Sequence, residues 1–528
     1  MESLWRTGRD RVDGSALPSG VHHDVAIVGA GITGLATGLM LVREGRDVAI
    51  VESGEVAELA TGGNTGKVTL LQGSVLQSLR RHHPASLVRA YVEANRAGAA
   101  WLREFADDAG VPYTVRTALS YAHTPRGLAT VDAEVAAARE AGLPAHRLGV
   151  EAGHDVPFPV MGAAALDGQF AIDPVRVADA LARAFIAAGG SLYTRTHVHA
   201  VRTIPHPCLE TDAGRLHARR IVLATGAPIV DRGLTFAKVR GSRSSCVAFE
   251  LDEAVPPTMM LSVDAPGRSL RPVTADDGPA EAVRLVVGGN GHPVGRADSE
   301  AALVDDLVAW TRRHYPSARP THRWSAQDYE SHNLVPFVGT MPRTLGCVRF
   351  ATGYAKWGLS NGPAAALRLA AEIRGTAFLE RPRWMVRIAT RLTVPSDIGR
   401  GLREGANVGV EAAKGWLRAE ETPVPVPRPA EGEGVVANRA GRPVAISTVD
   451  GRTRAVSAVC SHLGGVVEWN DEECTWDCPL HASRFAPDGT RIEGPASTGL
   501  SRVAHPHDDA SSAEPSGVRP TSGASRGR

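Results

Sequence analysis

The stretch Asp24–Glu52, DVAIVGAGITGLATGLMLVREGRDVAIVE, decides the fold of this 528-residue chain. Val25 to Val28 is a short apolar run rich in β-branched residues, which is typical of a buried parallel strand. The glycine turn GAGITG follows at once, and apolar residues then recur at helical spacing. Val48 to Val51 is a second buried strand with Glu52 at its end. We therefore predict a strand–turn–helix–strand unit.

Each part of this unit has a physical role in binding a dinucleotide. Gly29 allows a tight turn, Gly31 lets backbone N–H groups approach a pyrophosphate, and Gly34 lets helix and strand pack closely. The helix N-terminus favours the phosphate charge. The carboxylate of Glu52 can accept hydrogen bonds from a ribose diol, and it would repel the 2′-phosphate of NADP. This stretch alone leaves FAD and NAD open.

Composition excludes several classes of function. A chain of this length predicts about three to four domain-sized modules. The net charge of +1 gives no field that would attract nucleic acid. Residues 1–20 lack the apolar core of a signal peptide, and no apolar run is long enough for a transmembrane helix. The six scattered cysteines are not a disulfide framework, so we expect a reducing, cytoplasmic location.

A second glycine-rich stretch follows the nucleotide-binding unit. Residues 60–67 read ATGGNTGK and include Thr65 and Lys67. A flexible connection would also explain this composition, but the chain must pass over a bound cofactor here, and binding residues concentrate on such loops. We predict that Thr65 and Lys67 contact the cofactor.

Two later strands end in loops of the same kind. The strand Ile221–Leu223 ends in ATG at 224–226, whose small residues allow close backbone approach to a ligand. A further strand leads into TGYAKWGLSNG at 352–362, and we predict a helix over Ala364–Arg374. A helix N-terminus with Lys356 nearby forms a positive pole, which the N1–C2=O edge of a reduced flavin requires. An ordinary surface lysine is the alternative.

The remaining segments give a coarse architecture. Residues 236–324 alternate as strands and turns and predict a β-rich, substrate-side domain. Within it, GGNGH at 288–292 fails as a second nucleotide loop because Pro293 follows, so a hairpin turn is predicted. Helices are predicted over Val88–Ala109, Thr130–Ala141 and Pro174–Ala188, the last with Asp173 as its N-cap, and a strand over Ser191–Arg202.

The chain beyond residue 380 changes character. Residues 381–417 form a basic amphipathic helical pattern, which could lie on a membrane or pack as a connector. Pro395 interrupts the pattern and favours the connector. A proline-rich linker follows Thr422, short strands are predicted within 432–505, and 506–528 is predicted to be a disordered tail.

Four metal-binding side chains are grouped within this last strand-rich segment. Cys460-x-His462 is followed after 15 residues, 463–477, by Cys478-x2-His481. A Cys2His2 set would fit zinc. The spacing instead resembles the Rieske [2Fe–2S] domain, as do the flanking residues Leu463, Gly464, Pro479, Ser483, Phe485 and Gly494-Pro495-Ala496. The resemblance implies that the two cysteines hold one iron and the two histidines the other, which raises the reduction potential.

Departures from the Rieske pattern are informative. High-potential members carry a disulfide where this chain has Gly465 and Leu480, and a tyrosine where it has Phe485. Ser483 could still donate a hydrogen bond to a bridging sulfur of the cluster. We hypothesise an intermediate or low reduction potential. Cys474 breaks the ligand spacing and is predicted to be a free thiol.

Taken together, the nucleotide-binding unit and the Rieske pattern make residues 20–500 resemble the glycine/D-amino-acid-oxidase-like (DAO family) FAD-dependent oxidoreductases with a C-terminal Rieske domain. The resemblance rests on GAGITG with Glu52, TGGNTGK at 61–67, GQFAIDP at 168–174, LATGAP at 223–228 and TGYAKWGLSNG at 352–362. It implies FAD as the dinucleotide. It also implies an α/β Rossmann-type FAD-binding domain with an interleaved β-rich substrate domain, followed by an all-β Rieske domain.

The resemblance also assigns boundaries and cofactor contacts. The FAD parts are about 20–115, 166–235 and 325–380, the substrate parts about 116–165 and 236–324, the connector and linker 381–431, and the Rieske domain 432–505. Adenine would bind the backbone at His197-Val198. The implied cofactor contacts are Gly29, Gly31, Gly34, Glu52, Thr65, Lys67, Val198, Thr225, Gly226, Gly358 and Asn361.

The activity implied is oxidation of a small substrate, commonly at a C–N bond, by hydride transfer to flavin. Electrons would pass to the Rieske cluster and on to an external acceptor, a small redox protein or a quinone-like molecule. No spacing or partner singles out a catalytic acid or base among Lys356, Tyr354, His292, His332 and Arg240.

Two other classes of function stay open: an electron-transfer reductase that serves a redox protein or oxygenase, and a redox sensor with little turnover. Anaerobic addition of amines and amino acids, followed by absorbance and EPR, separates them. Because a proline-rich linker stands between the two cores, we expect His481→Ala to remove the cluster and leave FAD bound.

Overall fold

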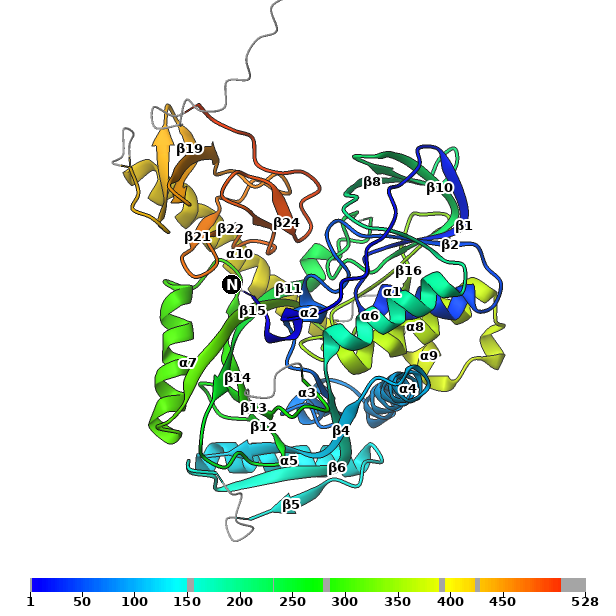
Figure 1. The fold of residues 1–528 in the computed structure, drawn as a ribbon, viewed down its shortest axis with the longest axis vertical. Coiled ribbons are helices and arrows are strands. Elements are labelled where there is room, and N and C mark those ends of the chain that lie inside the picture. The colour runs from blue at the N-terminus through cyan, green and yellow to red at the C-terminus, as the bar shows by residue number, and fades with distance from the viewer. Residues whose placement is uncertain are drawn as a thin grey trace, which may run out of the picture.

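The computed structural model describes residues 2–149, 156–230, 232–278, 285–388, 395–422 and 428–504. Figure 1 shows a main body of two sheets and their helices, residues 2–388, with the strands of residues 434–493 beside it, drawn in orange to red. The predicted tail 506–528 and most of the proline-rich linker lie outside the described residues.

The first sheet of the main body is mostly parallel. Its strands run in the order β16-β17-β10-β1-β2-β7, and β9 and β8 extend from β10. The carboxyl ends of its parallel strands meet at one edge, which is where ligands bind in such sheets. The bounds are β1 (Val21–Val28), β2 (Val48–Val51), β7 (Ser191–Tyr193), β8 (Val198–Arg202), β9 (Cys208–Thr211), β10 (Gly214–Leu223), β16 (Phe337–Thr340) and β17 (Val348–Thr352).

The predicted strand–turn–helix–strand unit is confirmed as β1, α1 (Ile32–Val42) and β2. Helices α1, α6 (Pro174–Ala187) and α8 (Gly358–Arg374) pack together on one face of this sheet, and α4 (Ala85–Ala109) lies against α8 (Figure 1). The side chain of Asp173 accepts the N–H groups of Val175 and Arg176, so the predicted N-cap of α6 is confirmed.

Helix α8 begins six residues earlier than the sequence predicted, at Gly358 instead of Ala364. The prediction placed the helix start directly after Pro363. In the structure Pro363 lies inside the helix, where it removes one intrahelical hydrogen bond. Buried contacts of Leu359, Ala365 and Leu369 with the core outweigh that loss.

The second sheet is mostly antiparallel and runs β15-β11-β14-β13-β12-β4-β6-β3, with β5 beside β6. Its strands come from segments far apart in the chain, as the interleaved substrate domain implies. The bounds are β3 (Lys67–Val68), β4 (Tyr113–Ala122), β5 (His146–Leu148), β6 (Gly162–Ile172), β11 (Val239–Glu250), β12 (Met259–Ser262), β13 (Arg268–Pro272), β14 (Leu285–Pro293) and β15 (Arg319–Ser331).

Several local predictions in this region are wrong. The stretch 288–292 is not a hairpin turn but part of β14, where the pairing with β11 shifts register and Asn290 has φ 52°. Residues 300–314 form helix α7 within the segment predicted as strands. The strand predicted over 191–202 is two strands, β7 and β8.

The remaining helices of the main body are short or peripheral. Helix α5 starts at Pro125, ahead of the predicted Thr130, because the Thr124 side chain caps it. The other bounds are η1 (Leu4–Arg6), α2 (Ala60–Gly63), α3 (Val75–His82), α5 (Pro125–Glu140), η3 (Phe236–Lys238), α7 (Glu300–His314), η4 (Phe378–Glu380) and α9 (Arg383–Arg387).

The start of the predicted connector, near residue 381, packs against the main body. Trp384, Met385 and Ile388 are buried in a core cluster with residues of α4. Pro395 is the first residue of helix α10 (Pro395–Glu421), which contacts strands β18 and β19. Among the helices of the described ranges, none combines the length and apolar character that a membrane crossing needs.

The C-terminal strands form two small antiparallel sheets, as predicted for residues 432–505. One has the order β18-β19-β20 and the other β21-β22-β23-β24. The bounds are β18 (Gly434–Arg439), β19 (Arg442–Val449), β20 (Arg452–Ser457), β21 (Glu468–Asn470), β22 (Thr475–Asp477), β23 (Arg484–Phe485) and β24 (Arg491–Glu493).

Candidate functional site

The turn after β1 has room for backbone only. Gly29 has φ 106°, and a Cβ there would lie 2.6 Å from the carbonyl oxygen of Ala224. A Cβ on Gly34 would lie 2.0 Å from the oxygen of Gly29. Gly31 is the N-cap of α1 and has extended backbone. The glycines keep the backbone of the turn accessible, which fits a pyrophosphate, and Thr61 Oγ1 accepts the first N–H of α1, that of Ile32, at 3.1 Å.

Glu52 is fixed beside this turn. Its carboxylate accepts the N–H of Ala30 at 2.7 Å and the N–H of Gly54 at 3.0 Å. Burial raises the pKa of Glu52, and these hydrogen bonds act in the opposite direction. The position fits the ribose diol expected from the sequence.

A cavity of about 540 Å³ opens from the glycine turn, and we call it the glycine-turn cavity. Its wall contains nine of the eleven predicted cofactor contacts: Gly29, Gly31, Glu52, Thr65, Lys67, Val198, Thr225, Gly226 and Gly358. The turn, the 60–67 loop and the two later strand ends thus meet at one place, as the parallel sheet requires.

The other two predicted contacts lie outside the cavity wall. Gly34 packs against the turn, which is the role predicted for it. Asn361 also lies away from the cavity wall. Its side chain is buried within α8, where it bonds to Asn95 at 3.1 Å and to the carbonyl of Trp357 at 3.1 Å. Because α8 begins before Asn361, this residue points into the protein.

Lys356 reaches into the glycine-turn cavity from a strained turn. Ala355 and Lys356 both have positive φ, 48° and 74°, which is uncommon for residues with side chains. The Lys356 ammonium donates to Ser244 Oγ at 2.6 Å and to Asp328 Oδ1 at 3.2 Å. Burial raises the pKa of Asp328, and Lys356 opposes that shift. No sequence signal pointed to Ser244 or Asp328, which lie on β11 and β15.

Lys67 is a second cation on the cavity wall. Its ammonium donates to the carbonyl of Met260 at 2.7 Å and to Ser269 Oγ at 2.6 Å. Burial, and the nearby Arg271 guanidinium, lower the pKa of Lys67 to about 7. This lysine can therefore hold or release a proton near neutral pH.

Of the other residues considered for catalysis, Tyr354 alone lines the glycine-turn cavity. Its hydroxyl lies 3.0 Å from Thr33 Oγ1. His292 lies outside it and pairs with Glu300 at 2.7 Å; although burial acts in the opposite direction, this carboxylate raises the pKa of His292. Arg240 pairs with Glu330, and His332 lies beyond the cavity wall, so neither is placed for chemistry there.

The four predicted metal ligands are brought together as two pairs. The thiols of Cys460 and Cys478 hydrogen-bond to one another, and the ring centroids of His462 and His481 are 5.1 Å apart. The described residues contain no group of three or more His, Cys, Asp or Glu side chains around a single metal position. Two ligands on each side fit a two-iron cluster, with one pair per iron.

Donor groups converge on the cysteine sulfurs. The bond with Cys478 lowers the pKa of Cys460, as do the N–H of His462 and the hydroxyl of Ser483. The Ser483 oxygen in turn accepts the N–H of Ala496 at 3.0 Å, which orients its hydroxyl. The Ser483 hydroxyl, predicted as a donor to a bridging sulfur, thus lies at the Cys460 sulfur.

Gly465 and Leu480 stand at the two positions that form a disulfide in high-potential Rieske proteins, and they lie next to each other. A Cβ on Gly465 would lie 2.6 Å from Leu480 Cγ and 3.1 Å from Cys478 Sγ. The leucine side chain occupies the space that a second cysteine pair would take. Phe485 is fully buried, and Cys474 is a free thiol away from the ligands.

The two cores are not separate, contrary to the expectation drawn from the linker. Arg491, Glu493 and Gly494 of the C-terminal sheets line the glycine-turn cavity. Ser497 accepts a hydrogen bond at 3.1 Å from His197 Nε2, next to the predicted adenine site. No local pattern in the sequence could have shown that residues 491–497 reach the nucleotide site.

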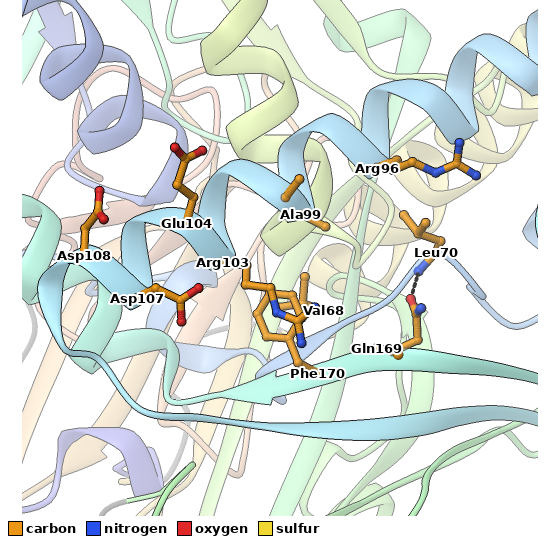
Figure 2. Close-up of a pocket in the computed structure, with 12 residues that line it drawn as sticks. Val68, Leu70, Arg96, Ala99, Arg103, Glu104, Asp107, Asp108, Gln169 and Phe170 are labelled. Carbon is orange, nitrogen blue, oxygen red and sulfur yellow. Dashed lines mark hydrogen bonds between the residues drawn. The ribbon is translucent and has the colours of Figure 1, made fainter.

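A second cavity, of about 520 Å³, lies between α4 and strands β3 and β6 (Figure 2). Figure 2 shows Arg103 turned toward the Phe170 ring, and its guanidinium carbon is 5.3 Å from that ring's centroid. The amide of Gln169 accepts the N–H of Leu70 at 2.8 Å. This cavity shares no lining residue with the glycine-turn cavity and is separate from both predicted sites.

The fold and the two sites define a flavin-binding oxidoreductase that carries an iron–sulfur domain. The family model "FAD dependent oxidoreductase" (DAO) matches residues 24–372, and the "Rieske [2Fe-2S] domain" model matches residues 424–504. The chain therefore belongs to the DAO family of FAD-dependent oxidoreductases, with a C-terminal Rieske domain. FAD and a [2Fe–2S] cluster are the cofactors of these two parts.

Known relatives share this architecture. The chain is 27% identical over 510 residues to a Bacillus subtilis (strain 168) protein with the provisional name Rieske 2Fe-2S iron-sulfur protein YhfW, covering 95% of this chain and 97% of that one. The main body resembles glycine oxidase from Geobacillus kaustophilus, with TM-score 0.60 and 21% identity, over 71% of this chain and all of that one. L-amino acid deaminase from Proteus vulgaris gives TM-score 0.58 and 16% identity, over 74% and 99%. At these identities the two structures show the fold.

Proposed function

We propose that this protein is an FAD-dependent dehydrogenase that oxidises a small amine or amino acid and delivers the electrons through the Rieske cluster to an external one-electron acceptor. The C–H bond next to nitrogen breaks, and its hydrogen leaves with the electron pair. The N–H proton is released and a C=N bond forms. Two acceptor molecules, of a small redox protein or a quinone-like compound, each take one electron.

One observation carries this proposal: the two redox sites share a wall. Gln327 and Tyr329 of β15 line the glycine-turn cavity. The Gln327 amide donates to the carbonyl of Ala482 at 2.8 Å, one residue after the ligand His481. Bound FAD supplies hydride acceptance, the cluster supplies one-electron transfer, and a short packed path between them is what such a relay needs.

We assign the nucleotide contacts accordingly. Gly29, Gly31 and the α1 N-terminus bind the pyrophosphate, Glu52 binds the ribose, and the backbone at Val198 binds adenine. The flavin end is contacted by the remaining predicted residues on the cavity wall, Thr65, Lys67, Thr225, Gly226 and Gly358. Cys460 and Cys478 hold one iron, and His462 and His481 hold the other.

We assign substrate binding to the part of the glycine-turn cavity lined by Lys356, Ser244 and Asp328. Asp328 lines the cavity, and burial raises the pKa of its carboxyl, which suits it to accept a proton from a substrate amine. Lys356 holds that carboxylate in place and adds positive charge at the cavity wall. Substrates of the amine and amino acid class are supported by the names of the similar structures, a glycine oxidase and an L-amino acid deaminase.

A cytoplasmic location belongs to the same proposal. All six cysteines are free in the structure, including the four outside the Rieske ligand set. A reducing compartment keeps such thiols from pairing.

The deciding experiment is anaerobic mixing of the FAD- and iron-loaded protein with a panel of amines and amino acids. Bleaching of the flavin absorbance, followed by the EPR signal of a reduced Rieske cluster, supports the proposal. Bleaching only with NADH or a reduced protein would instead support an electron-transfer reductase. No response to either donor would support a redox sensor.

A further inference from the structure

The imidazole ligands of the cluster face the main body. The Phe236 ring, in η3, has its centroid 5.5 Å from that of His462 and 5.1 Å from that of His481. Both contacts are nearly perpendicular, at 85° and 86°, and the two imidazoles are at 88° to each other. The three rings therefore form a closed set of edge-to-face contacts, the preferred geometry of aromatic pairs.

The loop that carries one of these ligands is held closely on the main body. We call residues 478–483 the ligand loop. A Cβ on Gly241 would lie 2.2 Å from the Cβ of Ala482, so strand β11 and the loop touch at a position that admits no side chain. Arg296 Nε donates to the carbonyl of Pro479 at 2.9 Å. Together with the bond from Gln327, these contacts fix the loop on both sides of its histidine.

A buried charge also ties the two parts together. Arg243 of β11 has a side chain only 2% exposed, and its guanidinium pairs with Glu473, in the turn between β21 and β22, and lies 3.6 Å from Glu493 of β24. Burial lowers the pKa of Arg243 to about 10. A guanidinium this buried needs carboxylate partners, and the docked arrangement is the one that supplies them to Arg243.

We propose that Phe236 is a positioning residue that seats the imidazole edge of the Rieske cluster on the FAD-binding main body and shields that edge from external redox partners. This inference rests on the proposed function. Electrons then enter the cluster from the cavity side, across the wall formed by Gln327 and Tyr329. The external acceptor takes them from a part of the C-terminal domain that Phe236 does not cover.

The test compares Phe236→Ala, Phe236→Leu and Phe236→Tyr with the full-length holoprotein. Leu234→Ala is the matched control, because Leu234 lies two residues away and is 62% exposed. Two rates are measured for each: cluster reduction after the flavin has been photoreduced anaerobically, and cluster reduction by added reduced methyl viologen. Photoreduction needs no substrate, so the result does not depend on the proposed substrate class. FAD content, iron content and the reduced-cluster EPR spectrum are recorded alongside.

We expect Phe236→Ala and Phe236→Leu to slow flavin-to-cluster transfer at least tenfold and to speed reduction by methyl viologen severalfold. Phe236→Tyr should restore both rates, and Leu234→Ala should leave both unchanged. If Phe236→Ala loses iron, the two rates of Phe236→Leu, which keeps most of the apolar volume, test the proposal. Unchanged rates in an iron-loaded Phe236→Leu protein would overturn the proposal. A failed amine screen with the expected rates here would overturn only the proposed function.

Discussion

The side-chain amide of Gln327, which lines the glycine-turn cavity, donates a 2.8 Å hydrogen bond to the carbonyl of Ala482, which lies between two residues at the iron–sulfur site, His481 and Ser483. A single side chain thus links the wall of the glycine-turn cavity to the loop that carries His481. Arg243, on the neighbouring strand β11, adds a buried ion pair between the same two parts. The FAD-binding body and the Rieske domain are therefore one docked unit, and the predictions below depend on that.

Replacing Arg243 should loosen the docking. Arg243→Met leaves Glu473 and Glu493 with Arg484 as their remaining buried partner, and breaking a buried pair costs about 3–5 kcal/mol. Thermal unfolding of the loaded protein should begin several degrees lower. The matched control is Arg240→Met on the same strand, whose half-exposed pair with Glu330 should contribute at most about 1 kcal/mol. Equal effects of the two variants would contradict a special role for Arg243.

Replacing Glu52 should weaken FAD binding. Glu52→Ala removes a carboxylate that we assign to the ribose, and hydrogen bonds to charged groups contribute about 1.5–3 kcal/mol, roughly a tenfold to hundredfold change in Kd. Fluorescence titration of apoprotein with FAD measures this. Asp47→Ala is the control, because Asp47 is an exposed carboxylate next to the other end of β2. An unchanged FAD affinity of Glu52→Ala would refute the assignment.

The Rieske cluster should have a reduction potential below the upper part of the range of about −150 to +300 mV. Leu480 and Gly465 leave no disulfide at the cluster, and Phe485 lacks a hydroxyl donor. Ser483→Ala should lower the potential by a further few tens of mV, because its hydroxyl stabilises charge on the Cys460 sulfur; about 59 mV corresponds to a tenfold change for one electron.

EPR-monitored redox titration measures both values. The control is Ser461→Ala, since Ser461 is adjacent to Cys460 but bonds to the carbonyl of Thr498. A wild-type potential at the top of the range, or a shift in Ser461→Ala equal to that in Ser483→Ala, would contradict this account.

Replacing Lys356 should change the pH dependence of flavin reduction by substrate. Burial raises the pKa of Asp328 and Lys356 opposes this shift, so in Lys356→Met the carboxyl should keep its proton to higher pH. The acid limb of the rate profile should move to higher pH, and the rate at neutral pH should fall by roughly a hundredfold. Stopped-flow absorbance measures it. FAD content should not change, and Lys414→Met, an exposed lysine on α10, should behave as wild type. A parallel loss of FAD would point to a binding role only.

The free energy of unfolding should fall as pH rises toward neutrality, because the buried Glu134 loses its proton in that range. It is fully buried and accepts the N–H groups of Leu76 and Gln77, and burial raises its pKa from 4.5 to about 7. The folded state therefore binds this proton more tightly than the unfolded chain. Its stabilisation is fully present below about pH 4.5 and is lost as pH rises to about 7, at up to about 1.4 kcal/mol per pH unit.

The measurement is the Tm at pH values on either side of this window. Glu134→Gln should remove part of the decline in Tm. The matched control is Glu140→Gln on the same helix, whose exposed carboxylate pairs with Arg80 and should leave the pH dependence as it is. An identical decline in all three proteins would rule out Glu134 as its source.

The sequence by itself determined the features that depend on short stretches of chain. The positions of Gly29, Gly31 and Glu52 follow from the tight geometry of one turn between two strands, and the Rieske ligands follow from their spacing on two loops. Both were confirmed as neighbours in space. The strand ends at 224–226 and 352–362 also met at the cavity, because parallel strands bring their carboxyl ends to one edge.

Only the tertiary structure decided how the sites relate to each other. Asn361 could not be placed from sequence, because the start of α8 depends on core packing. That packing keeps Pro363 inside the helix, where proline is disfavoured. Ser244, Asp328 and Lys356 meet because β11, β15 and the turn before α8 are neighbours across more than a hundred residues of chain. Phe236 reaches His462 and His481 for the same reason. Periodicity and spacing report the local backbone, whereas the contact between two redox centres is fixed by packing and buried charge between distant segments.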